Sequence, residues 1–166
     1  MDIKLAIPLA LHQLSAIVWI GGAFFSQFVL RRALKADLTP EERLPLMLRV
    51  YQAFFHWLWA AIVLQWVSGA WLMLHSLKTN GQMVGLHVYV MALVAAILTL
   101  RLLFAHLSTY QKLQAAVARE NWNWAAAKVS VLRRVIRLHL ILGLIAVLAG
   151  TLGPHLPTVW VHPAAF

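Results

Sequence analysis

Long apolar runs separated by short polar stretches dominate this chain. Four runs qualify as membrane spans, at about residues 5–30, 50–74, 86–104 and 135–152. A helix needs about 20 apolar residues to cross the hydrocarbon core of a bilayer. The pattern therefore predicts an all-α protein with a single membrane domain over residues 1–166. Because short connections make neighbouring helices antiparallel, we expect a transmembrane four-helix up-down-up-down bundle.

Polar residues between the runs mark helix ends. Thr39-Pro40-Glu41-Glu42 has the form of a capping box with proline at the first helical position, so the second helix is predicted to begin at Pro40. Asn121 or Asn123 can cap the last helix in the same way. Three prolines in residues 154–166 predict an irregular tail.

Charge along the chain predicts its orientation. Lysine and arginine gather in the loops at residues 31–49 and 107–134, whereas Lys4 and Lys78 are the cations of the opposite side. Cytoplasmic loops of membrane proteins collect these residues. Both basic loops are therefore expected to be cytoplasmic, with both termini and the tail external.

Composition supports a lipid environment and excludes several functions. The chain is 62% hydrophobic and 11% charged, which is more apolar surface than a soluble domain of 166 residues can hide. The net charge of +9 is explained by the basic loops, so nucleic-acid binding is not expected. Cysteine is absent, which excludes disulfides and thiolate-bound metals. All five acidic residues lie outside the predicted spans, so neither hydrolysis nor proton-coupled transport is expected.

Eight histidines in so apolar a chain are the main chemical signal. Ionisable groups inside a membrane are costly and tend to be functional. His12 lies roughly 10 Å into the first span and His87 lies near the external mouth of the third. A cytoplasmic layer holds His56, His106 and His139. The remaining three lie at or beyond helix ends, where solvation explains them: His75, His155 and His162.

Axial ligation of haem is one use for such imidazoles, because neutral imidazole suits iron and a four-helix bundle can hold the ring. One face of the first helix carries His12, Ser15, Trp19, Gly22 and Ser26. One face of the last helix carries His139, Gly143, Ala146, Gly150 and Gly153. The small residues leave room for a macrocycle or, alternatively, let helices pack closely. Structural hydrogen bonding is the alternative role for the histidines.

Arginines near the cytoplasmic layer are candidates to pair with haem propionates. Arg101 lies inside the third span, and Arg133, Arg134 and Arg137 precede or enter the fourth. The alternative for the cluster is anchoring at the cytoplasmic interface. Arg101 can also extend its charged head to that interface.

Copper is a second candidate ligand. Met73, His75, Met83 and His87 gather near the external mouth, which would suit an external copper site using His12 deeper inside. Copper transport usually shows thiolate or thioether ligands, and here no tight methionine cluster occurs. Methionine as apolar filler is the alternative explanation.

Short motifs in three helices resemble the CopD (copper resistance D) family of membrane proteins. They are Leu11-His12 with Val18-Trp19-Ile20-Gly21-Gly22 and Arg31-Arg32, then Gly85-Leu86-His87, and the stretch from Arg137 to Gly143. The resemblance covers most of the four spans and implies a multi-pass protein of the bacterial inner (cytoplasmic) membrane.

The family name implies copper uptake, although the broader group is similar to haem-binding proteins. The chain is distantly similar to HemJ-type porphyrinogen oxidases, where the position of His87 holds a lysine. It is also similar in plan to cytochrome b561-like proteins, which carry haems in two membrane layers.

We therefore expect a haem b protein with one or two haems, acting in electron transfer or as a membrane oxidoreductase. His12 and His87 are the expected metal ligands, and His56, His106, His139 and Arg101 are the candidates for a second haem. A quinone or an external protein is the expected redox partner, and a homo-oligomer is compatible with the pattern. Copper uptake, porphyrinogen oxidation and a purely structural subunit are the alternatives.

Overall fold

The structure, a computed structural model, describes residues 3–79, 84–155 and 160–161, and its helices form four long rods. The first rod joins α1 (Ile3–Phe24), the π-helical η1 (Phe25–Leu30) and α2 (Arg31–Asp37). The second rod is α3 (Pro40–Thr79). The third joins α4 (Leu86–Phe104), the π-helical η2 (Ala105–Tyr110) and α5 (Gln111–Ala118). The fourth joins α6 (Trp122–Leu152) and the 3₁₀ turn η3 (Gly153–His155).

Within the described residues, four helices are long and apolar enough to cross a membrane, and each contains one of the four predicted runs. Large apolar side chains cover their outer surfaces. Leu14, Ile17, Trp57 and Val67 are each more than half exposed. Exposed apolar surface of this extent is rare on soluble monomers and is covered by lipid in membrane proteins. The chain is therefore a multi-pass membrane protein.

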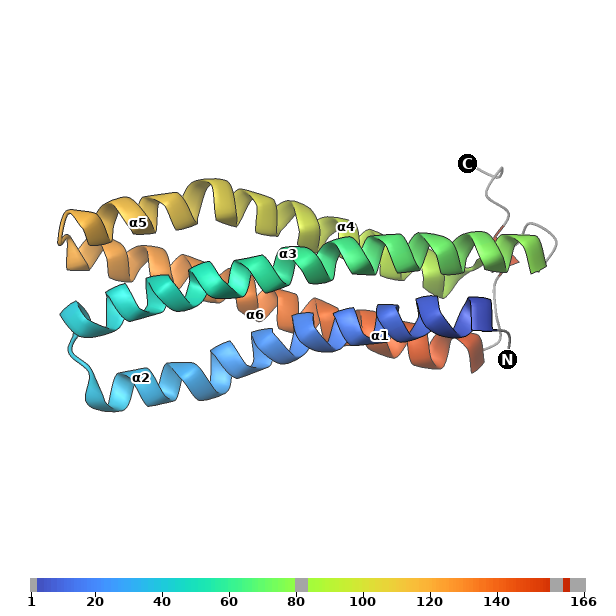
Figure 1. Cartoon of the computed structure of the whole chain (residues 1–166), viewed down its shortest axis with the longest axis horizontal. Helices are drawn as coiled ribbons and strands as arrows, with labels where there is room; N and C mark the ends of the chain where they lie inside the picture. Colours follow the sequence, from blue (N-terminus) through green and yellow to red (C-terminus); the bar gives the residue numbers. More distant parts are fainter. Residues whose placement is uncertain (1–2, 80–83, 156–159, 162–166) are drawn as a thin grey trace.

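The rods lie along one another in a long bundle (Figure 1). In that view, the start of α1 and the end of α6 lie at the right, whereas α2, α5 and the start of α6 lie at the left. α1 packs against α3 and α6, and α4 packs mainly against α6. Leu44 in α3, Leu113 in α5 and Leu132 in α6 are almost fully enclosed, as is Val84 beside the start of α4.

Glycines allow these close approaches. A Cβ placed on Gly143 would lie 3.0 Å from Cγ1 of Ile20, and one on Gly150 would lie 2.8 Å from the Met91 sulfur. A Cβ on Gly22 would overlap the ring of Phe54. Neighbouring side chains thus fill the space above each of these glycines. This is the close packing of membrane helices through small residues that the sequence offered as one explanation.

Both predicted helix starts are confirmed. α3 begins at Pro40, and the Thr39 backbone N–H donates to Oε2 of Glu42 at 3.0 Å. The Thr39 hydroxyl donates to the same oxygen at 2.8 Å, so Glu42 binds Thr39 through both its backbone and its side chain. At α6 the cap is Asn121, whose Oδ1 accepts the Trp124 N–H at 3.1 Å.

The tail differs from the prediction of an irregular segment. Residues 153–155 continue α6 as a 3₁₀ turn, and β2 (Trp160–Val161) pairs antiparallel with β1 (Val84–Gly85). The prediction is wrong at these positions because the extended backbone before α4 offers N–H and C=O groups that need partners. Residues 156–159 and 162–166, which the prediction also included, lie outside the described residues.

Candidate functional site

His12 lies at the contact between α1 and α3, where both of its ring nitrogens have partners. Nδ1 lies 3.0 Å from the Ser68 hydroxyl, and Nε2 lies 2.8 Å from the Gln65 side-chain nitrogen. Its ring rests on Gly69, where a Cβ would lie 3.1 Å from the His12 Cε1. Glycine at position 69 thus provides the space that the imidazole occupies.

The direction of these hydrogen bonds determines the tautomer of His12. The Ser68 hydroxyl donates to the Leu64 carbonyl at 2.5 Å, so its oxygen accepts from Nδ1–H of His12. The Ser15 hydroxyl donates to Oε1 of Gln65 at 2.5 Å, which turns the amide nitrogen of Gln65 toward the ring. That nitrogen donates to Nε2. With the Gln65 amide in this orientation, the hydrogen bonds fit the neutral tautomer of His12, with the proton on Nδ1 and the lone pair on Nε2.

Neutral imidazole with a free Nε2 lone pair is the form that binds iron or copper. Metal-bound histidines usually donate their other N–H to a neighbouring group, which orients the ring, and Ser68 does this for His12. Gln65 stands where a metal would lie, so coordination requires its side chain to turn away. The Ser15 hydroxyl keeps a partner in that case, because it also lies 2.9 Å from the His12 carbonyl oxygen.

His87 lies in the first turn of α4, between two glycines. A Cβ on Gly85 would lie 2.5 Å from the His87 Cε1, and one on Gly153 would overlap its Cβ. Among the described residues, no hydrogen-bond partner faces its ring nitrogens. The ring is half-buried and packs closely against both glycines.

The structure does not bring His12 and His87 into contact. His12 faces α3, whereas His87 faces the end of α6. Contacts of α6 with Ile20 and Met91 place His12 roughly level with Gly150, about one helical turn, or 5 Å, from the level of His87. A shared ligand between the two imidazoles stays a prediction.

His139 is the most buried histidine and lies between α6 and α4. Its Nδ1 lies 2.8 Å from the Val135 carbonyl and its Nε2 lies 3.0 Å from the Leu98 carbonyl. A neutral imidazole carries one N–H, so it can donate to only one of the two oxygens. The Trp19 ring lies beside it, with centroids 5.9 Å apart, and the Trp19 N–H is buried without a partner.

His56 and His106, the other residues predicted in that layer, have different surroundings. His56 is exposed on α3, and its Nδ1 lies 2.8 Å from the Gln52 carbonyl. His106 lies in η2, with its ring 4.8 Å from Phe55 and 5.5 Å from Tyr110, and its Nδ1 is buried without a partner. No contact joins His56, His106 and His139 within the described chain.

Apart from Arg101, the predicted propionate partners are also separated from the histidines. Arg101 is exposed on α4, near enough to His139 to interact with it electrostatically, and Arg134 is exposed on α6. Arg137 lines a cavity on the outside of the α1–α6 contact, and none of the eight histidines lines it. Anchoring or another ligand is a simpler role for this cluster than haem propionate.

The described residues do not form a cluster of ligands that would hold copper. Within the described residues, no three or more histidine, cysteine, aspartate or glutamate side chains are grouped to hold a metal ion. His75 and His155 are exposed at helix ends, in agreement with the sequence analysis. Met83 and His162 lie outside the described residues.

Three site residues were not predicted. Gln65 and Ser68 are polar side chains inside the second apolar run, which is the signal that could have identified them. Gln27 lies in η1 and donates to the Arg133 carbonyl at 2.6 Å, which joins the first rod to α6. Gln27 lies near the end of the first apolar run, where a polar residue is a weaker signal than one in the middle of a run.

Fold and site together define a multi-pass membrane protein whose helices meet through buried polar and histidine side chains. Comparisons with protein-family models, with curated proteins and with solved structures found no match. The resemblance of its motifs to the CopD family thus remains an expectation, and the function is argued from the residues.

Proposed function

We propose that this chain is a bacterial inner-membrane protein that binds haem b through His12 and serves in electron transfer. The proposal includes helices that cross the bilayer in alternating directions, with both termini external and the basic segments at residues 31–49 and 107–134 cytoplasmic. The concentration of cations in those segments supports this orientation.

The state of His12 is the single observation that supports haem binding most. Ser68 and Gln65 hold its half-buried ring in the orientation of the neutral tautomer with Nε2 as an acceptor, at the contact between α1 and α3. This is the protonation state and orientation that an axial ligand needs. His87, whose ring nitrogens have no hydrogen-bond partner among the described residues, is the second ligand in this proposal.

A bound haem would supply one-electron chemistry at its iron. The contributions of this chain would be those of a binding site. His12 and His87 would ligate, Ser68 would hold the proton on Nδ1, and the surrounding apolar side chains would exclude water and so influence the reduction potential. A quinone or an external protein would be the electron partner.

An absorption spectrum of the detergent-solubilised full chain tests the proposal. We expect a Soret band that shifts on reduction with dithionite and that is lost in His12→Ala. The matched control is His75→Ala, which removes an exposed histidine at the end of α3 and should leave the band unchanged. A wild-type protein that stays colourless after haem is added back would contradict haem binding. Stoichiometric bound copper in that colourless protein would support copper uptake instead.

A structural role for His12 is the second candidate, because both of its ring nitrogens already have hydrogen-bond partners within the chain. His12, Ser15, Gln65 and Ser68 join α1 to α3 without any further group. In this case the protein is colourless and metal-free, and His12→Ala lowers the melting temperature while His75→Ala does not.

A further inference from the structure

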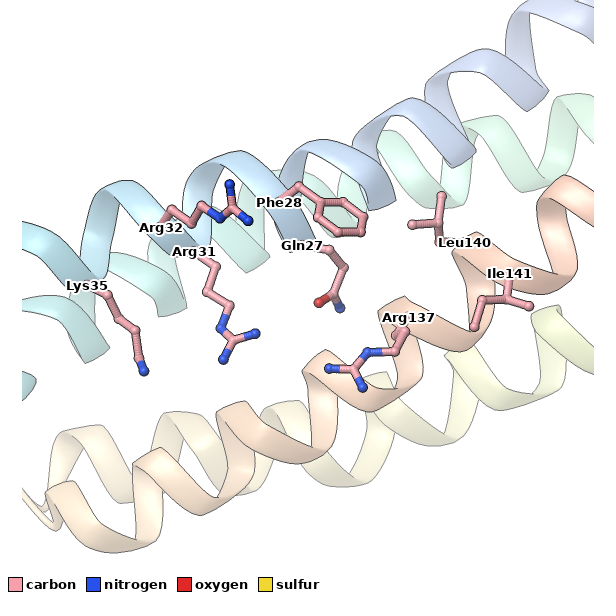
Figure 2. A pocket seen from close by; sticks show the side chains of 8 residues that line it. All are labelled: Gln27, Phe28, Arg31, Arg32, Lys35, Arg137, Leu140 and Ile141. Atoms are coloured by element: carbon pink, nitrogen blue, oxygen red, sulfur yellow. The ribbon is translucent and has the colours of Figure 1, made fainter.

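A cavity of about 550 Å³ lies on the outside of the bundle, between the first rod and α6 (Figure 2). Its lining comes from η1, α2 and the middle of α6: Gln27, Phe28, Arg31, Arg32, Lys35, Arg137, Leu140 and Ile141. Figure 2 shows the charged heads of Arg31, Lys35 and Arg137 in the space between the two helices.

The four cations of this cavity have no described anion to neutralise them. None of Arg31, Arg32, Lys35 and Arg137 forms an ion pair with a described residue, and no acidic residue lines the cavity. Arg31 and Lys35 are also four residues apart on α2, a spacing at which like charges repel along a helix. The cavity thus concentrates positive charge without compensation, which favours an anionic ligand.

Polarity changes along the cavity. Leu140 and Ile141 lie at one end of the cavity and the charged heads of Arg31 and Lys35 toward the other, with Phe28 between them (Figure 2). On the first rod, Phe28 lies seven residues before Lys35, which is roughly 10 Å of helix. On α6, Ile141 lies four residues beyond Arg137, or about 6 Å. A ligand that fits both ends carries negative charge at one end and hydrocarbon at the other.

A second, smaller cavity of about 170 Å³ adjoins the first and shares Arg31 and Lys35 with it. Arg43 and Arg133 add two more cations to its lining. The Nε of Arg133 is buried and has no hydrogen-bond partner. A buried donor without a partner is costly. This unpaired guanidinium nitrogen at the second cavity is therefore an independent sign that an acceptor such as a phosphate oxygen belongs there.

We propose that this cavity binds the phosphate headgroup of an anionic phospholipid. The phosphate lies among Arg31, Lys35 and Arg137, and an acyl chain runs along Phe28, Leu140 and Ile141. The apolar end favours a lipid over free phosphate, and the cations lie in the segments that the positive-inside rule assigns to the anionic cytoplasmic leaflet. The site uses no histidine and is independent of haem binding.

Native mass spectrometry of the full chain in a neutral detergent tests this proposal, with phosphatidylglycerol and phosphatidylcholine as probes. We expect phosphatidylglycerol to be retained and phosphatidylcholine to be lost. The double variant Arg31→Gln, Arg137→Gln should weaken phosphatidylglycerol binding by about 30-fold, because two cations near the membrane surface are removed. Lys35→Gln alone should weaken it by about 5-fold, a smaller change that does not depend on the double variant folding.

The matched control is Arg49→Gln, Arg134→Gln, which removes two exposed cations that line neither cavity. Equal loss of lipid in this control, or equal retention of the two lipids by the wild type, would overturn the proposal. Displacement of the lipid by millimolar inorganic phosphate would overturn the lipid assignment in favour of a soluble phosphate. His12→Ala should leave lipid binding unchanged, which separates this result from the fate of the haem proposal.

Discussion

Polar groups toward one end of the first rod have partners within the chain, whereas cations toward the other end have none among the described residues. At the His12 network, formed by His12, Ser15, Gln65 and Ser68, each polar side chain has a hydrogen-bond partner within α1 and α3. At the basic cavity, formed where η1 and α2 face α6, the cations meet no described anion. The first arrangement is complete within the chain, whereas the second lacks its counter-charges. The His12 network therefore needs no further group, whereas the basic cavity needs a ligand to neutralise its charge.

The surroundings explain why both arrangements are tolerated. Polar groups between membrane helices have no water to bond with, so they must satisfy one another. Long basic side chains near a membrane surface can still extend to water or to lipid headgroups. A lipid site is therefore expected at the basic cavity, and a complete hydrogen-bond network at His12.

The largest effect should come from the close contact between Gly153 and His87. Gly153→Ala would place a methyl group on the Cβ of His87, which cannot move without shifting the backbone of α4. We expect a loss of about 1–3 kcal/mol in the free energy of unfolding, measured by denaturation in detergent. Gly21→Ala is the control, since a Cβ there meets nothing within 4 Å. Equal stability of the two variants would contradict the packing described for His87.

A smaller loss should follow when the His12 network is opened. Gln65→Leu leaves Nε2 of His12 without its donor and removes one acceptor of the Ser15 hydroxyl. Hydrogen bonds between membrane helices average about 0.6 kcal/mol and reach about 1.7 kcal/mol, so we expect a loss in that range. The control is Gln52→Leu, which makes the same substitution at an exposed position of α3 and should leave the stability unchanged. The hydrogen bonds would carry no net stability if both variants unfold alike.

The smallest effect should have the opposite sign, at the basic cavity. In a neutral detergent without anionic lipid, Arg31→Gln should stabilise the protein by about 0.2–0.5 kcal/mol, because it removes the repulsion with Lys35 one turn away. Thermal unfolding at low and high salt measures this, and the gain should shrink as salt screens the charges. Arg49→Gln provides the comparison, and a destabilised Arg31→Gln would mean that the cations have partners in the protein.

The four membrane helices could be predicted from the sequence because each depends on about 20 consecutive apolar residues. The starts at Pro40 and after Asn121 could be predicted because the capping groups lie within four residues of each other. The π-helical segments η1 and η2 could not, since their sequences carry no local signal that distinguishes them from α-helix. They depend on how the rods pack.

The level of a residue along its helix could also be predicted, but its contacts could not. The position of His12 in the first run predicted a buried imidazole, yet its partners depend on which face α3 turns toward α1. For the same reason, three histidines predicted at one level have three separate surroundings: His56, His106 and His139. Level follows from residue number along a helix, whereas neighbours follow from the rotation of each helix about its axis.

The short pairing of β1 with β2 has a consequence for His87. Gly85, which forms part of the seat of this imidazole, is joined in register to Trp160, and Gly153 on the other side of the ring precedes the same terminal segment. The two glycines that contact the imidazole are thus linked to each other through the chain between Gly153 and Trp160. Shortening the chain after residue 155 should loosen His87 while every residue of α4 stays unchanged.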